Sequence, residues 1–270
     1  MSRIHDALKK AEIQQLGYIE DRPQREVATT VEELPAPSVA SMPSFSLPLT
    51  ADALLERTIT HNWHPSPRML FFEQHETAPV ETFRTLRSRL YQIREKSSLK
   101  KLLIAGASAG EGTSFIAANL AQAMAQGQGQ RALLIDGDLR KGDLHTELGA
   151  PASPGLTEYL SGEKEELAVI QRGPMENLFF VPTGEKDEHP LEMIVNGRMR
   201  VLLNRVEPLF EWIIFDSSPA NEVSDASQLA RYCDAVLLVV RSSVTPSDLA
   251  ARARDEFFGK NILGTVLNGV

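Results

Sequence analysis

The chain has 270 residues with 42% hydrophobic and 24% charged content, which is enough for one sizeable hydrophobic core and an accessory tail. Its formal net charge of -8 at pH 7 disfavours duplex nucleic acid as a partner, because phosphate backbones bind concentrated basic surfaces. The chain has one cysteine and hence no internal disulfide, and it starts without an apolar signal-like segment, so we expect a cytoplasmic protein.

Residues 1–18 are predicted to form an amphipathic helix, because apolar residues recur at helical spacing on one stripe. The stripe consists of Ile4, Ala7, Leu8 and Ala11. We expect it to contact a membrane protein or the chain's own domain, and an unpartnered helix fits the same pattern. Residues 19–76 are rich in Pro, Ser, Thr and acidic residues without a sustained period, which predicts a disordered linker.

Residues 77–270 are predicted to form one α/β domain. Strand-like apolar runs alternate with helix-forming runs, which is typical of a mostly parallel sheet with helices on both faces. The strands are expected near 101–107, 131–137, 177–182, 211–216, 234–241 and 262–268, and the helices near 79–94, 113–127, 190–207 and 246–257. In such sheets ligands bind at the carboxyl ends of the strands, so we expect the functional site there.

The loop after the first of these strands has the form of a phosphate-binding loop. Residues 107–114 read Ala-Ser-Ala-Gly-Glu-Gly-Thr-Ser between a strand-like and a helix-forming run, the setting that the motif G-x-x-x-x-G-K-[ST] requires. Backbone N–H groups at a helix N-terminus favour phosphate. We therefore predict that ATP or ADP binds here and that Ser114 meets a magnesium ion. The predicted nucleotide contacts in the loop are Ala109, Gly110, Glu111, Gly112, Thr113 and Ser114.

Thr113 stands where this motif has its lysine. A charge-assisted phosphate contact contributes roughly 1.5–3 kcal/mol, or about ten- to hundredfold in affinity. Catalysis is expected to lose more than binding, since a donor aimed at transition-state charge is worth about a hundred- to thousandfold. Lys101, Arg140 and Lys141 are the candidate substitute cations, and the sequence does not choose among them.

Two later strands end in carboxylates. Asp136 and Asp138 follow the apolar run Leu133-Leu134-Ile135, with Arg140 two residues further on, and Asp216 follows Trp212-Ile213-Ile214-Phe215. Magnesium prefers hard oxygen ligands, so we predict that Ser114, Asp136 and Asp216 hold it, with Asp216 orienting a magnesium-bound water. Arg140 is predicted to contact the nucleotide. A helix cap at Asp136 and a solvated Asp138 would be the purely structural interpretation.

Together these stretches resemble the cytoplasmic kinase domain of the bacterial tyrosine kinases (BY-kinases), which partner chain-length-determinant proteins in capsule and exopolysaccharide export. That family has a P-loop, a strand motif apolar-Asp-x-Asp-x-Arg and a third strand ending Asp-Ser/Thr-Pro/Ser-Pro. Residues 110–114, 136–140 and 216–219 stand in these places. The resemblance covers residues 77–270, and residues 1–12 are similar to the head of soluble members associated with exosortase-type polysaccharide loci.

Upstream, Glu81-Thr82-Phe83-Arg84-Thr85-Leu86-Arg87 looks like the family's E-x-x-R-x-x-R motif, which in relatives lies at the subunit contact of a ring. On a helix, Glu81, Arg84 and Arg87 share one face, and the apolar residues between them occupy another. We therefore expect a homo-oligomeric ring that uses these three residues. An ordinary solvated charged face is the alternative.

The resemblance implies an ATP-dependent protein-tyrosine kinase that binds ATP or ADP with magnesium and uses Asp136, Asp138 and Asp216 for catalysis. In this interpretation Asp138, alone or with Asp136, assists metal binding or accepts the tyrosine proton. The implied location is the cytoplasm, at the inner face of the plasma membrane through a membrane chain-length-determinant (polysaccharide co-polymerase) partner. The alternatives are a catalytically dead pseudokinase scaffold and a switch ATPase of the septum-placement and plasmid-partitioning type. The four tyrosines are scattered, and Tyr18 is the one expected to reach a neighbour.

Overall fold

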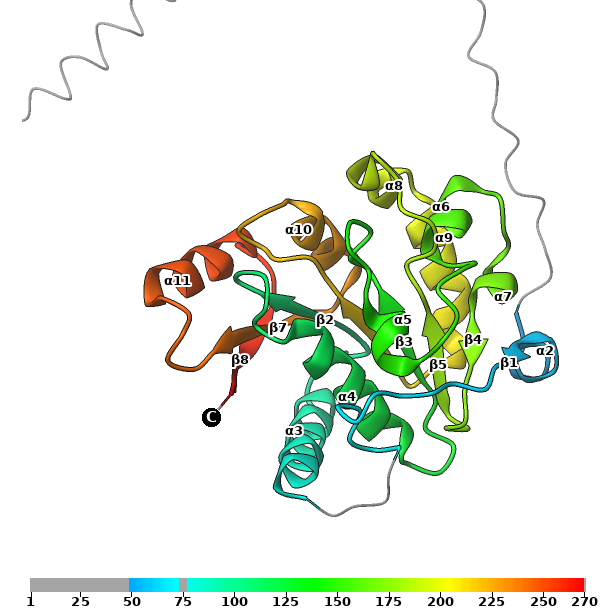
Figure 1. Ribbon diagram of the computed structural model, residues 1–270, viewed down its shortest axis with the longest axis horizontal. Helices are drawn as coiled ribbons and strands as arrows, with labels where there is room; N and C mark the ends of the chain where they lie inside the picture. Colours follow the sequence, from blue (N-terminus) through cyan, green and yellow to red (C-terminus); the bar gives the residue numbers. More distant parts are fainter. Residues whose placement is uncertain (1–48, 73–76, 270) are drawn as a thin grey trace, which may run out of the picture. The chain divides into compact units, whose positions relative to one another are not determined.

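The computed structural model describes residues 49–72 and 77–269, and within them the chain forms an eight-stranded sheet (Figure 1). The strands are β1 (Ile59–Thr60), β2 (Lys101–Gly106), β3 (Ala132–Asp136), β4 (Gln171–Arg172), β5 (Leu178–Val181), β6 (Trp212–Asp216), β7 (Ala235–Arg241) and β8 (Ile262–Asn268). Their order across the sheet is β1-β4-β5-β3-β6-β2-β7-β8. Each neighbouring pair is parallel except β4 and β5. The predicted mostly parallel sheet is therefore confirmed.

Helices cover both faces of this sheet, so β3 and β6 are buried along their whole length. Successive side chains of β2 enter opposite cores: Leu103 and Ala105 point to one, Leu102 and Ile104 to the other. The first core contains residues of α2 (Ala51–Arg57), α6 (Leu156–Ser161), α7 (Glu166–Val169), α8 (Pro190–Val195), α9 (Arg198–Val206), α10 (Asp225–Leu229) and α11 (Ser247–Glu256). The second contains residues of α3 (Ala78–Arg94), α4 (Thr113–Ala125) and α5 (Leu144–Leu148).

The long predicted helices are confirmed with one correction. The helix expected over 190–207 is divided into α8 and α9 by Gly197, whose φ of 88° lies in the left-handed region that interrupts a right-handed helix. Short 3₁₀ helices at Glu207–Leu209 and Ala230–Tyr232 follow α9 and α10. Helices α5, α6, α7 and α10 were not predicted, because segments of four to six residues show too little periodicity. No helix in the described ranges has the length and apolar content needed to cross a membrane.

Residues 49–72 are ordered against the domain, whereas the sequence places them in the linker 19–76. Thr50 caps α2 by accepting the Ala53 N–H at 3.2 Å, and β1 pairs with β4. Trp63 and Phe71 are buried among core residues. Such widely spaced anchors produce no periodic pattern, which explains the misprediction. The predicted helix 1–18, the rest of the linker to residue 48, residues 73–76 and Val270 lie outside the described residues.

Residues 66–72, which we call the strap, run along α4 and are held by two polar side chains of that helix. Asn119 accepts the Leu70 N–H at 2.8 Å and donates to the Arg68 carbonyl at 3.2 Å. Gln122 accepts the Phe71 N–H at 3.3 Å. Both polar side chains are fully buried, so these bonds replace water for the strap backbone. The strap is thereby fixed to the helix that begins at the predicted phosphate loop.

Candidate functional site

The loop between β2 and α4 has the backbone conformation that an anion site requires. Gly110 and Gly112 have φ values of 83° and 87°, in the left-handed region where a side chain is strained. A β-carbon at Gly112 would also collide with the Asn268 side chain. Helix α4 starts directly after this glycine, at Thr113, and has no acidic residue in its first turn. Its first N–H groups and its positive dipole end therefore favour a bound anion.

A cleft of about 350 Å³ opens in front of the loop, which is a size typical of small-molecule sites. Predicted residues from two separate strand ends meet in its lining: Ala109, Gly110, Gly112, Thr113, Ser114 and Asp138. The lining also includes Arg68, Ser108, Phe115, Lys141, Asp143, Glu147, Ser217 and Pro219. Arg68 was missed because it belongs to the predicted linker, where no pattern in the sequence marks it as a site residue.

Asp136 and Asp216 lie beneath this cleft as register partners at the carboxyl ends of β3 and β6. Their exposures are 0% and 2%, and burial raises the pKa of Asp136 to about 7. Burial also raises the pKa of Asp216 well above its ordinary value, and the charge of Asp136 adds to the increase. Two adjacent buried carboxylates favour a shared proton or a bound cation.

The oxygen donors of the site fit magnesium together with a nucleotide. Ser114 lies close enough to Asp216 to lower its pKa against the larger, raising effect of burial, and Asp216 Oδ1 has no hydrogen-bond partner among the described residues. Within these ranges no three or more His, Cys, Asp and Glu side chains are grouped to hold a metal by themselves. Magnesium commonly takes one or two carboxylates and completes its shell with water and phosphate oxygens. Ser114 and Asp216 would thus hold it beside a nucleotide, where its charge would neutralise the phosphates.

Asp136 and Asp138 also shape the loop that follows β3. Asp136 accepts the Asp138 N–H at 3.3 Å and the Leu144 N–H at 3.2 Å, one on each carboxylate oxygen. Asp138 accepts the N–H groups of Arg140 and Lys141 at 3.2 Å each, and it keeps its place in the cleft lining. Asp138 is thus the member of this pair that faces the cleft, whereas Asp136 supports the loop from below.

The three candidate substitute cations take different positions. Lys101 starts β2 at the end opposite the loop, where it pairs with Glu207 at 2.7 Å and Asp234 at 3.4 Å. The Arg140 guanidinium donates through Nε to Asp225, a residue of α10 that is 1% exposed, at 2.7 Å. Neither is in the cleft lining, whereas Lys141 is. The geometry therefore directs Lys101 and Arg140 away from the predicted phosphate position.

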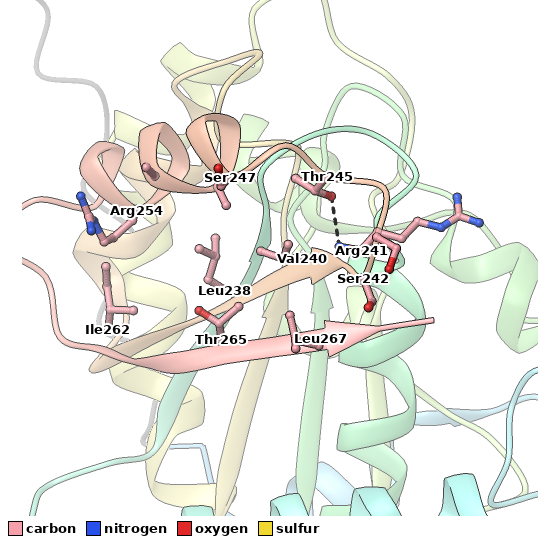
Figure 2. Close-up of a pocket in the computed structure, with 13 residues that line it drawn as sticks. Leu238, Val240, Arg241, Ser242, Thr245, Ser247, Arg254, Ile262, Thr265 and Leu267 are labelled. Atoms are coloured by element: carbon pink, nitrogen blue, oxygen red, sulfur yellow. Dashed lines mark hydrogen bonds between the residues drawn. The ribbon is translucent and has the colours of Figure 1, made fainter. Parts of the chain in front are cut away.

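Glu111 was predicted to contact the nucleotide, but its side chain is turned into the protein and is absent from the cleft lining. Its carboxylate accepts the Ala107 N–H at 2.7 Å and the Thr245 hydroxyl at 2.7 Å. The Glu111 carbonyl accepts a hydrogen bond from Asn268 Nδ2 at 2.7 Å. Figure 2 shows Thr245 in the turn between β7 and α11, where its hydroxyl also accepts the Arg241 N–H at 3.1 Å. The side chain of Glu111 therefore ties the loop to elements near the C-terminus.

That turn borders a second groove, of about 510 Å³, between α11 and the strands β7 and β8 (Figure 2). Leu238, Val240 and Leu267 from the strands make it largely apolar. Arg254 at its far end pairs with Asp255 at 2.7 Å. The groove brings together none of the predicted site residues.

The predicted ring residues lie on α3, beside α4. Arg84 pairs with Glu81 on the helix surface. Arg87 donates through Nη1 to the Ala123 carbonyl at 2.8 Å and so helps to hold α3 on α4. Arg84 and Arg87 also line a groove of about 710 Å³ between these helices. The role of the three residues in a ring contact remains a prediction.

A glycine-rich loop between a central parallel strand and a helix, with carboxylates at the ends of two neighbouring strands, defines a P-loop nucleotide-binding fold. Residues 99–257 match the family model described as cellulose biosynthesis protein BcsQ. The kinase domain of the Escherichia coli tyrosine kinase ETK superposes with a TM-score of 0.72 at 31% identity, covering 78% of this chain and 82% of that chain. MinD from Pyrococcus horikoshii, solved with Mg-ADP, shares the fold alone, with a TM-score of 0.53 at 22% identity over 63% of this chain and 70% of that chain.

Curated relatives agree with the kinase-domain likeness. The tyrosine-protein kinase YwqD of Bacillus subtilis is 32% identical over 191 residues, which are 70% of this chain and 80% of that protein. The putative tyrosine-protein kinase AmsA of Erwinia amylovora is 30% identical over 245 residues. That match takes in 89% of this chain and 34% of AmsA, so the chain spans about a third of the length of this relative. The chain belongs to the bacterial tyrosine kinase family.

Proposed function

We propose that this chain is a nucleotide-binding, tyrosine-kinase-like regulator of exopolysaccharide biosynthesis and export. The observation that carries the proposal is the phosphate loop at the start of α4, with Ser114 beside the buried Asp216, whose Oδ1 has no hydrogen-bond partner among the described residues. Backbone N–H groups and oxygen donors arranged in this way suit a magnesium-bound ATP or ADP. The match to a family described by cellulose biosynthesis supports the link to polysaccharide.

In this proposal the loop backbone from Gly110 to Thr113 binds the phosphates, and Ser114 and Asp216 hold magnesium directly or through water. Asp138 faces the cleft and accepts the proton of an incoming tyrosine hydroxyl, while Asp136 supports it from below. Positioning and charge neutralisation are most of what a protein contributes to phosphoryl transfer.

The proposed setting is the cytoplasm, at the inner face of the plasma membrane, with a membrane chain-length-determinant protein as the partner. A homo-oligomeric ring would form through Glu81, Arg84 and Arg87. The resemblance of these residues to the family's ring motif supports this part of the proposal, and sedimentation velocity on the full chain with and without nucleotide tests it.

A second candidate is a pseudokinase scaffold that binds nucleotide without transferring phosphate. The observation that favours it is Thr113, which lines the cleft at the position where the motif has a lysine. Loss of that cation weakens the stabilisation of transition-state charge more than it weakens ground-state binding. Nucleotide binding is therefore expected to persist where phosphoryl transfer fails. The likeness to MinD supports a switch ATPase only through the fold that the two share.

Calorimetric titration of the full chain with ATP and magnesium, with Asp216→Ala as the control, tests the proposal. A phosphotyrosine blot of the same sample separates the two candidates. Saturable binding that requires Asp216 supports a nucleotide-binding protein, and phosphotyrosine would then identify an active kinase. Absence of binding at millimolar ATP would contradict nucleotide-dependent regulation altogether.

A further inference from the structure

A guanidinium group from outside the phosphate loop stands at the cleft. Arg68, in the strap, lines the cleft together with Gly110, Gly112 and Thr113. The neighbouring Met69 is 2% exposed, and the Arg68 carbonyl accepts a hydrogen bond from Asn119 at 3.2 Å. The backbone that carries Arg68 is therefore fixed relative to α4, the helix that begins at the phosphate loop.

Two contacts aim the Arg68 side chain. Its Nη1 donates to Glu147 Oε1 at 2.8 Å, and its Cζ lies 5.7 Å from the centre of the Phe115 ring. Phe115 belongs to the first turn of α4, next to Ser114. Glu147 is itself oriented by the Ser66 hydroxyl, which donates to its Oε2 at 2.6 Å. The guanidinium is thus held over the helix N-terminus.

This ion pair is poorly placed to stabilise the fold, because the Arg68 side chain is 63% exposed. Pairs at such positions contribute little. Glu147 accepts a hydrogen bond from Nη1 of Arg68 alone. Within the described residues, Nε and Nη2 of Arg68 have no protein partner. A guanidinium with adjacent donors of this kind suits bidentate binding of a phosphate group.

The remaining basic side chains near the site are less suited to this role. Arg140 is committed to the buried carboxylate of Asp225. Lys141 also lines the cleft, but within the described residues no hydrogen bond or ion pair orients its ammonium group. Arg68 is thus the cation in the lining that is both oriented by side-chain contacts and left with donors for a phosphate.

We propose that Arg68 binds the outer phosphates of the nucleotide and supplies the positive charge that Thr113 does not. The inference rests on the proposed function, because it requires that the cleft takes a nucleotide. It places the cation on the strap, so that phosphate binding also holds the strap against α4.

The test is calorimetry of ATP with magnesium on the full chain, comparing the wild type with Arg68→Ala, Arg68→Gln and Lys141→Ala. Arg57→Ala is the matched control, since Arg57 lies on α2 and outside the cleft lining. Arg68→Ala and Arg68→Gln should each weaken ATP binding by roughly 10- to 100-fold, and the control should not. Arg68→Gln keeps the first part of the side-chain stem and a polar end but removes the guanidinium with its charge, so a matching loss in both variants attributes the effect to the guanidinium.

A double-mutant cycle with Thr113→Lys gives a second readout that a purely structural role would not move. If the loop lysine takes over the phosphate contact, Arg68→Ala should cost less than about threefold in the Thr113→Lys background. An equal penalty in both backgrounds would overturn the inference. So would ATP binding that is unchanged in Arg68→Ala, which leaves the proposed function standing. A wild type that binds no ATP would overturn both.

Discussion

The side chains of Glu111 and Thr245, which are 134 residues apart in the sequence, meet in a part-buried hydrogen bond of 2.7 Å. This bond, together with the one from Asn268 to the Glu111 carbonyl, connects the phosphate loop to the turn after β7 and to the end of β8. The shape of the loop therefore depends on parts of the chain that contact no phosphate.

Thr245→Val should destabilise the protein and weaken nucleotide binding. The substitution keeps the side-chain shape but leaves a Glu111 carboxylate oxygen without its hydroxyl donor, which costs about 1–3 kcal/mol. The thermal midpoint should fall by roughly 2–4 °C for each kcal/mol lost. Thr265→Val, on an exposed position of β8, is the matched control and should change neither property. Equal thermal midpoints for the two variants would show that the Glu111–Thr245 bond does not stabilise the loop.

Asp216→Asn should stabilise the protein while it abolishes magnesium-dependent binding. Burial holds the pKa of Asp216 well above its ordinary value, and the pKa of the neighbouring Asp136 is about 7. The folded protein thus retains protons that the unfolded chain releases, so the free energy of unfolding falls as pH rises from about 4 through these raised values. At pH 7.5, without magnesium and nucleotide, the variant should therefore melt above the wild type.

Scanning calorimetry between pH 4.5 and 7.5 measures this difference. The decline of stability with pH should be smaller in Asp216→Asn than in the wild type, because the variant lacks one of the two carboxyl groups whose pKa is raised. Asp255→Asn is the control, since the Asp255 side chain is 67% exposed and should leave the pH profile unchanged. A less stable Asp216→Asn at pH 7.5 would mean that the charge of Asp216 is favourable in the fold.

Thr113→Lys should raise the affinity for ATP by about ten- to hundredfold, because it restores a charge-assisted phosphate contact in a loop that already has its backbone geometry. Thr113→Met introduces a longer side chain without a charge, so it separates the electrostatic gain from the effect of side-chain size. Titration calorimetry with ATP and magnesium compares the three proteins. An unchanged dissociation constant in Thr113→Lys would indicate that the loop does not present its N–H groups to phosphate.

Asn119→Ala should release the strap from α4. The substitution opens a small cavity at the fully buried Asn119 and leaves the Leu70 N–H and the Arg68 carbonyl without their part-buried bonds, which costs about 2–5 kcal/mol. Limited proteolysis should then cleave within residues 66–72 faster than in the wild type. Asn261→Ala, at an exposed site before β8, is the control. If the two variants are cleaved at the same rate, Asn119 does not hold the strap.

Much of the fold followed from local sequence patterns. Five of the six predicted strands are apolar runs because both faces of the sheet are covered there, whereas the edge strand β8 is half exposed. Residues 107–114 adopt the phosphate loop because Gly110 and Gly112 accept left-handed φ values. The convergence of Asp138 with the loop follows from a general property of parallel sheets, whose carboxyl ends share one edge. These features were predictable because they depend on neighbouring residues or on the geometry common to parallel sheets.

The tertiary structure decided which side chains face the cleft. Arg140 turns to Asp225, Glu111 turns to Thr245, and Arg68 reaches the cleft from a segment whose composition predicts a linker. These pairings depend on the order of strands across the sheet and on a few buried anchors such as Trp63. Contacts between residues so far apart in the chain leave no periodic signal. The sequence by itself therefore determined the presence of a phosphate-loop pattern, and long-range packing determined which charged side chains lie at the cleft beside it.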